Sequence, residues 1–535
     1  MVFFHRSKNL QRLSGPLRRR LPFGANHAKP LAMRDAPPIS SALHRPDRRT
    51  VLAGLAVGLG LGPAEAQAPQ PSPAAPKPAA RPAPALVPPL PVQAESLRAA
   101  SVTAKLTGSD APDSTLMRFL REGDAGAGPQ PPELAVLRFR PGGDARIAIR
   151  NDLAQPLALA LRGLRRPLSG EAAGILAPGQ NGTLAFPTSQ SGSFLLQAAL
   201  PAPAREARAR GLHALVVVEE PRPPDVDHDV PLLVGDWRLT EKGELAGDFA
   251  DLRDAVRFGR LGNRLTVNGR AAPLELTVRP GARLRLRLAN VASARTIPLH
   301  AQKLVARVIA IDSTPCDPFD PLQRIVTLAP GHRCELIVDV PREAGIEARL
   351  EARFATPAPL LVIRTVGEPV GARGAVTPLP DPGLPAAIRL QNAARADLVI
   401  TGGLGREASL EPEALRRAFP DPNRIFQLNG GAIGDAPGSE PGKPLLRVKR
   451  GREVVLALMN RTAWPQVLGL AGHSFRLLHP YDDGWEPYFL DTVHIGAGQV
   501  LRVAFIADLP GRHALRSTIA DHAESGVATH LEVMP

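Results

Sequence analysis

Residues 276–290 read LTVRPGARLRLRLAN, and two similar stretches stand elsewhere in the chain, LRFRPGGDARIAIRN at 137–151 and LRVKRGREVVLALMN at 446–460. In each stretch a glycine stands nine residues before the asparagine that ends it: Gly142, Gly281 and Gly451. Apolar and polar residues alternate on both sides of the glycine, which indicates two strands joined by a turn. The repetition predicts three copies of one β unit.

A second similar segment follows each copy, at residues 176–186, 328–340 and 495–508. The alternation is strictest at residues 283–288, where arginine and leucine take turns. Such a pattern is typical of strands with one packed face and one solvated face. We therefore expect antiparallel sheets arranged as sandwiches or barrels.

The carboxy-terminal segment, residues 491–535, has a further recognisable frame. Within it, residues 516–522 read RSTIADH. This run stands in register with the His-Cys-His-Ile-x-x-His run of the multicopper oxidases, which the segment resembles. Further frame matches are VPLLVGDW at 230–237, LTVNGR at 265–270, FQLNGG at 426–431 and DDGWEPYFLDTV at 482–493. The resemblance implies an all-β fold of three consecutive cupredoxin-like Greek-key β-barrels.

The resemblance and the composition together predict how the chain is divided. We expect a leader with a twin-arginine signal peptide at 1–68, a Pro/Ala-rich linker at 69–95, and cupredoxin-like domain 1 at 96–222. Cupredoxin-like domain 2 follows at 223–368, a second linker at 369–390, and cupredoxin-like domain 3 at 391–535.

The leader carries an export pattern. Arg48 and Arg49 precede an apolar run at residues 51–62, and small residues at 64–68 suit cleavage by a signal peptidase. Because the paired arginines resemble the twin-arginine signal, we expect a periplasmic protein. The apolar run is shorter than the roughly 20 residues needed to cross a bilayer, so no membrane span is expected after cleavage. Met33 is an alternative start to Met1.

The charge and the cysteine content narrow the functional classes to which the chain could belong. The formal net charge is +14, but the basic residues are scattered instead of clustered with aromatic residues, so nucleic-acid binding is not expected. The chain holds two cysteines, Cys316 and Cys334. In an exported protein such a pair could form a disulfide, and we expect a structural role for both cysteines, with metal ligation as the alternative.

The copper ligands of the family are mostly absent. A type 1 copper site needs a cysteine thiolate, and Ser517 takes that position. The three-copper cluster of the family takes four His-x-His pairs, and this chain contains no His-x-His. The positions that the resemblance assigns to lost ligands are Ala160, Arg162, Gln197, Ala199, Gln466, Gly469, Ala471, Arg516, Ser517 and Thr518.

Two histidines remain at expected ligand positions, His473 and His522. We expect them to be hydrogen-bonded structural residues at the junction of domains 1 and 3, with a weak partial metal site as the alternative. Asp521 and Glu524 are expected in a solvated or capping role. No catalytic residue, no cofactor-binding residue and no bound cofactor is predicted, although copper is the family's cofactor.

The resemblance therefore implies an exported, multicopper-oxidase-like protein with degenerate copper sites. A non-catalytic periplasmic binding or scaffold protein for an unknown envelope protein or ligand fits these observations, and the superfamily offers a copper-free, twin-arginine-exported cell-division protein as a precedent. One alternative is a copper-dependent oxidoreductase with unorthodox ligands or a changed activity. Another is a basic surface that binds an envelope polyanion. Packed side chains at the lost ligand positions would favour the scaffold, and an open polar pocket the enzyme.

Overall fold

The computed structural model describes residues 93–108, 110–124, 130–199, 204–430, 442–480, 482 and 484–535. The predicted leader at 1–68, its paired arginines and most of the linker at 69–95 lie outside the described residues. The first strand begins at Ala94, two residues before the predicted start of domain 1. Among the described residues, no helix is long and apolar enough to cross a membrane.

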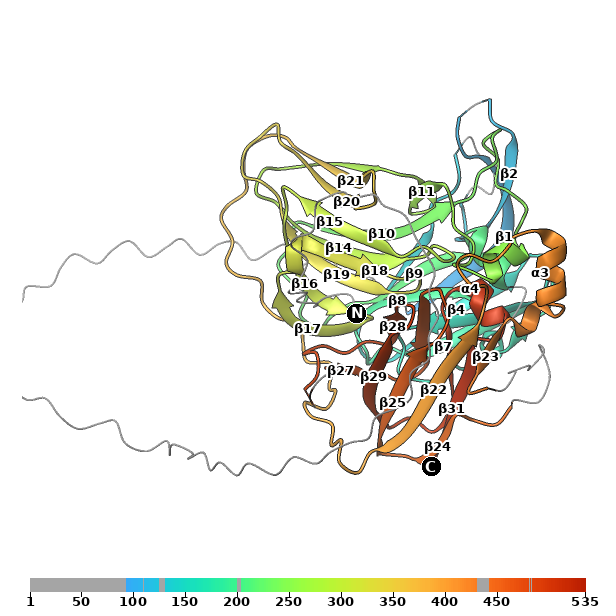
Figure 1. Cartoon of the computed structure of the whole chain (residues 1–535). Coiled ribbons are helices and arrows are strands. Elements are labelled where there is room, and N and C mark those ends of the chain that lie inside the picture. The colour runs from blue at the N-terminus through green and yellow to red at the C-terminus, as the bar shows by residue number, and fades with distance from the viewer. Residues whose placement is uncertain are drawn as a thin grey trace, which may run out of the picture. The chain divides into compact units, whose positions relative to one another are not determined.

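The first copy of the repeat builds two sheets, whose strands are blue to teal in Figure 1. One sheet has the strand order β2 (Asp113–Leu120), β1 (Ala94–Lys105), β4 (Asp144–Asn151), β7 (Asn181–Pro187). The other has the order β3 (Ala135–Phe139), β9 (His213–Val218), β8 (Gly192–Ala198), β5 (Leu157–Arg162), β6 (Ile175–Leu176). Leucines and isoleucines from both sheets share one buried core, so the pair forms a sandwich, called the first sandwich below.

The second sandwich follows the same plan, with extra edge strands. Its larger sheet has the order β12 (Arg270–Ala271), β11 (Arg264–Val267), β10 (His228–Trp237), β14 (Arg283–Asn290), β19 (Arg333–Asp339), β16 (Val305–Ile311), β17 (Thr314–Phe319). Its smaller sheet has the order β13 (Leu274–Val278), β21 (Ala358–Thr365), β20 (Glu347–Ala352), β15 (Ile297–Gln302), β18 (Ile325–Leu328).

The third sandwich repeats the order again, in orange to dark red in Figure 1. One sheet runs β23 (Phe426–Leu428), β22 (Ala394–Gly402), β25 (Arg452–Asn460), β29 (Val500–Ala507), β27 (Arg476–Leu478). The other runs β24 (Leu446–Lys449), β31 (Ala528–Met534), β30 (Gly511–Ser517), β26 (Gln466–Leu470), β28 (Thr492–Ile495). The second and third sandwiches share one continuous core cluster.

Helices are few and short in the described residues. The α-helices are α1 (Ala204–Ala209), α2 (Leu252–Ala255), α3 (Pro412–Ala418) and α4 (Ala520–Glu524), and single 3₁₀ turns lie at η1 (Glu171–Ala173), η2 (Leu322–Arg324) and η3 (Pro422–Arg424). Helix α4 follows β30 directly, and both α1 and α2 contact it.

The all-β class and the cupredoxin-like plan are confirmed, but two details of the prediction are wrong. The sheets are mixed, because each sandwich has a parallel pair in each sheet, such as β10 with β14 and β13 with β21. The sheets described here also stay open, with two edges each, so they do not close into barrels. Alternation in the sequence indicates that the two faces of a strand lie in different environments. It does not show whether the neighbouring strand runs parallel or antiparallel. The domain limits themselves remain predictions.

The glycines and asparagines of the repeat have the roles that the pattern predicts. Gly142, Gly281 and Gly451 all have positive φ, between 73° and 87°, in the turn between the two strands. The three asparagines at the ends of β4, β14 and β25 are fully buried. Each donates from Nδ2 to two or more backbone carbonyls and accepts at Oδ1 from the N–H two residues on. For Asn290 the carbonyls belong to Arg295 and Leu328, both at 2.8 Å.

The expected solvated face of β14 is buried, so that prediction is wrong. Arg285 and Arg287 are 1% and 0% exposed. Arg285 pairs with Glu220 and Glu335, and Arg287 donates to Ser193 at 3.1 Å. Ser193 and Glu220 belong to the first copy of the repeat, so the charged face of the second sandwich is covered by the first. The paired carboxylates offset part of the free-energy cost of burying these guanidinium groups.

Candidate functional site

Two pairs of neighbouring strands carry most of the positions that the resemblance assigns to copper ligands. In the first sandwich β5 pairs with β8, which sets Ala160 opposite Gln197. The backbone N–H of Ala199 continues this ladder to the carbonyl of Ala158 at 2.8 Å. Since both strands lie in one sheet, alternate side chains of each point to the same face.

In the third sandwich β26 pairs with β30, which sets Gly469 opposite Arg516 and Leu468 opposite Ser517. Ala471 and Thr518, just beyond these strands, continue the ladder by donating to the carbonyls of Ala514 and Val467, at 2.9 Å each. The positions that the resemblance assigns to ligands therefore lie on neighbouring strands, or directly beyond them, in one sheet of the first sandwich and one sheet of the third.

Arg162 crosses from the first sandwich to the third. A β-carbon on Gly469 would stand 2.8 Å from Nη1 of Arg162, so the guanidinium occupies the space beside that glycine. Nη2 donates to Oγ1 of Thr492 at 2.6 Å and lies 3.6 Å from Oδ1 of Asp491. Two positions assigned to metal ligands thus meet through a cationic side chain.

Asp491 links all three sandwiches. It pairs with Arg162 of the first and with Arg333 of the second, and Arg333 is 1% exposed. Asp312 of the second sandwich accepts from the backbone N–H groups of Asp491 and Thr492, at 3.1 and 3.0 Å. Burial and the neighbouring Asp491 raise the pKa of Asp312 to about 7. A network of ions and backbone amides therefore joins the sandwiches where the family places its cluster.

Two further guanidinium groups, those of Arg208 and Arg516, lie close to Arg162 of this network. Burial lowers the pKa of Arg208 to about 9, with contributions from the positive charges of Arg162 and Arg516. Burial and the charge of Arg162 also lower the pKa of Arg516. The positive charges of Arg162, Arg208 and Arg516 thus lie close enough to interact. Such an environment repels a metal cation.

A small cavity lies beside some of the positions that the resemblance assigns to copper ligands. Its volume is about 10 Å³, and it is lined by residues of all three sandwiches that include Gln197, Gly331 and Thr518. This is about the volume that one water molecule needs. A larger hollow of about 660 Å³ lies over the outer sheet of the first sandwich, at residues such as Arg98, Arg150 and Glu171, and includes no lost ligand position.

His522 is held by two hydrogen bonds and is fully buried. Its Nε2 lies 2.8 Å from the carbonyl oxygen of Arg257, and its Nδ1 lies 3.0 Å from Oε1 of Gln466. Burial lowers the pKa of His522 to about 4, so the ring is neutral near pH 7. A neutral ring has one N–H, which the carbonyl requires at Nε2. Nδ1 then faces Oε1 of Gln466, whose Nε2 donates to Oγ1 of Thr462 at 3.4 Å.

His473 belongs to a different cluster. Its ring meets that of His513 edge-on at 4.4 Å between centroids, and its Nε2 lies 3.5 Å from Oδ1 of Asp508. Burial and the charge of His513 lower the pKa of His473 to about 4. These partners all come from the third sandwich, and among the residues that the structure describes none of them contacts His522. The two candidate metal residues are therefore not brought together.

Ser517 and Asp521 belong to the carboxy-terminal run RSTIADH at residues 516–522. The hydroxyl of Ser517 accepts from the N–H of Ile519, the residue before helix α4, at 3.2 Å. Asp521 is 0% exposed, so of the two predicted roles, solvated or capping, the solvated one is wrong for this residue. Its Oδ2 accepts from the N–H of Arg260 at 2.8 Å, and burial raises its pKa to about 6. Glu524 pairs with Arg205 of α1, and both acids therefore tie α4 to neighbouring copies of the repeat.

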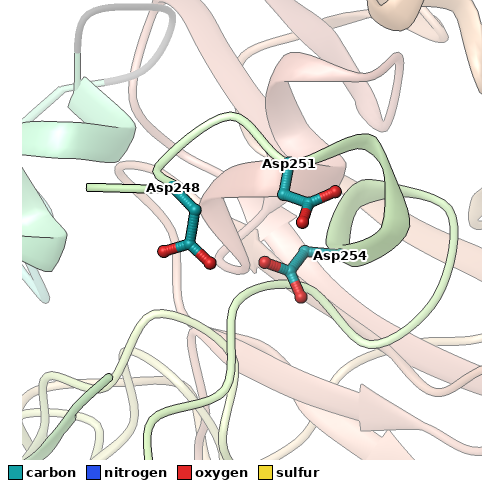
Figure 2. Close-up of side chains that lie close together, drawn as sticks. All are labelled: Asp248, Asp251 and Asp254. Atoms are coloured by element: carbon teal, nitrogen blue, oxygen red, sulfur yellow. The ribbon is translucent and has the colours of Figure 1, made fainter. Parts of the chain in front are cut away.

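Figure 2 shows three aspartates whose oxygens lie within 4.8 Å of one another: Asp248, Asp251 and Asp254. Among the described residues, no other group of three or more acidic, His or Cys side chains is close enough to hold a metal ion. Arg238 lies 2.8 Å from Asp248 and 2.6 Å from Asp254, and Arg253 lies 2.6 Å from Asp251. Because arginines neutralise all three carboxylates, the cluster serves as an ion-pair network around α2.

The residues at the ligand positions do not suit copper. Copper sites use imidazole nitrogens and thiolate sulfur. Here the side chains are guanidiniums, amides, hydroxyls and methyl groups, and both ring nitrogens of His522 face protein oxygens. Both cysteines are free thiols, and Cys334 lies in the core of the second sandwich.

The sequence did not point to Asp312, Arg333, Thr492 or Arg208, although they build the network. One signal was present in the repeats. Arg333 stands in the second copy where Asn181 stands in the first, so a buried strand of one copy carries a charge that the other lacks. Differences of this kind between otherwise matching copies identify positions with a partner outside the repeat.

Comparison with known proteins supports the same family. Residues 417–535 match the family model described as "Multicopper oxidase". The "Cell division protein FtsP" of Sodalis glossinidius is 28% identical over 433 residues, which cover 75% of this chain and 83% of that protein. The FtsP of Histophilus somni is 29% identical over 216 residues, but there the match spans only 44% of that protein and 38% of this chain.

Solved structures agree on the fold. The multi-copper oxidase of Pseudomonas thermotolerans superposes with a TM-score of 0.67 at 26% identity and covers 82% of this chain and 98% of its own. The McoA multicopper oxidase of Aquifex aeolicus gives a TM-score of 0.65 at 16% identity, covering 83% of this chain and 96% of its own, which shows the fold alone. The chain is thus similar in sequence to proteins named for cell division and similar in fold to oxidases.

Proposed function

Taking the chain as a relative of the multicopper oxidases, we propose that it is a copper-free member of that superfamily, exported to the periplasm, which acts in the cell envelope as a binding or scaffold protein. It carries no redox chemistry of its own. Its partner is an envelope protein or ligand, and the process in which it takes part is cell division.

The observation that carries this proposal is the place of Arg162. Its guanidinium fills the space beside Gly469, between two strands that would have to present metal ligands. Asp491 and Thr492 hold it there. A fixed positive charge at that point repels a bound cation. The same guanidinium joins the first sandwich to the third through Thr492 and Asp491.

The names of the matched relatives support the biological process. The Sodalis protein named for cell division aligns with 75% of this chain, and a scaffold role does not require the copper sites. The leader supports the location, since Arg48 and Arg49 before a short apolar run are typical of the twin-arginine route.

The enzymatic question is tested on protein purified from the periplasm. Copper content is measured by mass spectrometry, before and after loading with cupric salt, and oxygen uptake is followed with phenolic, cuprous and ferrous donors. The Pseudomonas thermotolerans oxidase is the positive control. We expect traces of copper and no oxygen uptake above the metal-only blank. A full complement of copper with turnover would show an oxidase with unorthodox ligands and contradict the proposal.

The role in division is tested by complementation. Cells depleted of this protein are expected to divide poorly, and plasmid-borne wild-type protein should restore division equally under copper limitation and copper supply. The Ser517→Ala variant should restore it as well, because a scaffold does not use the former thiolate position. Restoration that depends on copper, or normal division after depletion, would contradict the proposed role.

A further inference from the structure

Three loops meet beside the indole of Trp464, where the second sandwich adjoins the third. They are residues 256–263 after helix α2, residues 403–411 before helix α3 and residues 461–465 between β25 and β26. The backbone N–H of Leu404 donates to the carbonyl of Val256 at 2.8 Å, and Nε1 of Trp464 donates to the carbonyl of Leu404 at 2.7 Å. The three loops are therefore joined to one another, and Trp464 is held at their junction.

Aromatic rings and guanidinium groups gather at this junction. The ring of Phe258 packs on that of Trp464 with 4.4 Å between their centroids. Cζ of Arg257 lies 5.5 Å from the centroid of the Trp464 ring, and Cζ of Arg406 lies 5.2 Å from it. Phe258 is 37% exposed, Arg406 is exposed and Arg257 is half-buried. These four residues are called the Trp464 surface below.

The two guanidinium groups of the Trp464 surface have no carboxylate partner. Among the residues that the structure describes, the side chains of Arg257 and Arg406 form neither an ion pair nor a hydrogen bond. Glu407 follows Arg406 in the chain without pairing with it, and Asp254 of α2 is paired with Arg238 at 2.6 Å. The N–H groups of both arginines are therefore available to a partner.

The chemistry of the Trp464 surface favours an acidic protein partner. A guanidinium that lies over an aromatic ring is attracted to it and can still bind a carboxylate through its N–H groups. Because the ring already restricts the arginine side chain, less conformational entropy is lost when a carboxylate binds. Tryptophan, phenylalanine and arginine are also the residue types that are enriched at the centres of protein interfaces.

The spacing of the two arginines restricts the shape of the partner. Since both stand over the ring of Trp464, their Cζ atoms lie no farther apart than the sum of the two distances to that ring. In an extended peptide, side chains at positions i and i+2 lie on one side, about 7 Å apart. Two acidic residues at that spacing can therefore reach Arg257 and Arg406 together.

We propose that the Trp464 surface binds an extended acidic peptide segment of an envelope protein, with carboxylates on Arg257 and Arg406 and an apolar side chain against Phe258. The inference rests on the proposed scaffold function and names the chemistry of its partner. It uses none of the positions that the resemblance assigns to copper ligands. A phosphate polymer would also pair with the guanidinium groups, but it has no apolar group to cover the exposed ring of Phe258.

Binding is tested with protein purified from the periplasm and a fluorescein-labelled octapeptide. In this peptide glutamate alternates with alanine, and one alanine is replaced by phenylalanine, while a matched peptide carries lysine in place of glutamate. Fluorescence anisotropy at low salt gives the dissociation constant of each. We expect the acidic peptide to bind at least about tenfold more tightly than the basic one. Its affinity should fall as the ionic strength rises, because salt screens exposed charges.

Two double variants of equal net charge locate the binding. Arg257→Gln combined with Arg406→Gln should weaken binding of the acidic peptide about tenfold. Arg146→Gln combined with Arg452→Gln should bind it as the wild type does, because these arginines are exposed on β4 and β25 and form no ion pair among the described residues. Urea unfolding checks that both double variants are folded.

Three results would overturn the proposal. Equal weakening in the two double variants would mean that net charge alone attracts the peptide. Equal binding of the acidic and the basic peptide would show no preference for carboxylates. Tight binding of inorganic polyphosphate without binding of the acidic peptide would identify a different class of partner.

Complementation separates this proposal from the proposed function. At equal amounts in the periplasm, the variant with Arg257→Gln and Arg406→Gln should fail to restore division in depleted cells, and the variant with Arg146→Gln and Arg452→Gln should restore it. If both variants restore division, the Trp464 surface is not the docking site and the scaffold role stands. If the wild-type protein does not restore division either, the scaffold role fails, and the peptide measurements alone decide whether the surface binds acidic segments.

Discussion

The guanidinium of Arg162 on β5 lies against Gly469 on β26, in the space that a side chain at position 469 would need. In the family that this chain resembles, both positions carry metal ligands. The relationship predicts that residue 469 must stay glycine for a steric reason and that Arg162 is the cause.

Gly469→Ala is therefore expected to lower the free energy of unfolding by about 1–3 kcal/mol, the range for overpacking a filled site. Combining it with Arg162→Met should remove most of that loss, so the two changes should be non-additive in a denaturant-based double-mutant cycle. Gly247→Ala is the control, since a β-carbon there meets nothing within 4 Å. Strict additivity of the two substitutions would argue against the contact.

The pair formed by Asp491 and Arg333 should be among the most sensitive in the molecule. Asp491→Asn removes the carboxylate that faces an arginine with 1% exposure, which is expected to reduce stability by about 3–5 kcal/mol. Glu275→Gln disrupts an exposed pair with Arg364 and should change stability by about 0–1 kcal/mol. Urea titrations of the two variants compare them, and similar losses in both would contradict the central position of Asp491.

The three buried asparagines of the repeat predict three matching losses. Asn151→Ala, Asn290→Ala and Asn460→Ala each remove hydrogen bonds to backbone carbonyls and one from a backbone N–H, so each should cost about 2–3 kcal/mol. Asn423→Ala, at an exposed turn, should cost less than about 0.5 kcal/mol. If one of the three buried positions tolerates alanine as Asn423 does, the copies are not structurally equivalent.

Acid should weaken the fold partly through His522. Its pKa is lowered to about 4 in the folded protein, below the ordinary value of 6.5, because the ring is buried. Between these two pH values the unfolded chain binds a proton that the folded protein does not, so stability falls as the pH drops from 6.5 to 4. The contribution is about 3 kcal/mol.

His522→Gln removes this titration, so its stability should depend less steeply on pH over that window, as followed by urea unfolding at each pH. Asp521, whose pKa is raised to about 6, acts in the opposite direction in both proteins and cancels in the difference. His228→Gln, on the exposed start of β10, is the matched control. A pH profile of His522→Gln that runs parallel to that of the wild type would contradict this assignment.

Local pattern was enough to predict the strands and turns. Gly281 and Asn290 stand at fixed places in a repeated unit, and both the left-handed turn and the buried amide follow from residue type and spacing. The same pattern failed for Arg285 and Arg287. Alternation shows that the two faces of β14 differ, but only the carboxylates of Glu220 and Glu335, distant in the sequence, decide that the charged face is buried.

For the candidate site, the sequence alone shows which of the family's copper ligands are absent. It does not show the contacts that the side chains at those positions make. The absence of His-x-His and the serine at 517 are read directly from the chain. The partner of Arg162 is more than 300 residues away, at Thr492, and the acid that holds Thr492 in place, Asp312, comes from the middle copy. Contacts of such long range depend on how the three sandwiches pack, which no spacing rule encodes.

The most direct test of the central claim is a crystal of the full-length protein soaked in cupric salt and measured at the copper edge. With Arg162 seated between β5 and β26, we expect no anomalous peak beside Gly469 or between His522 and Ser517. A well-occupied group of copper ions at those positions, with Arg162 displaced, would contradict the account.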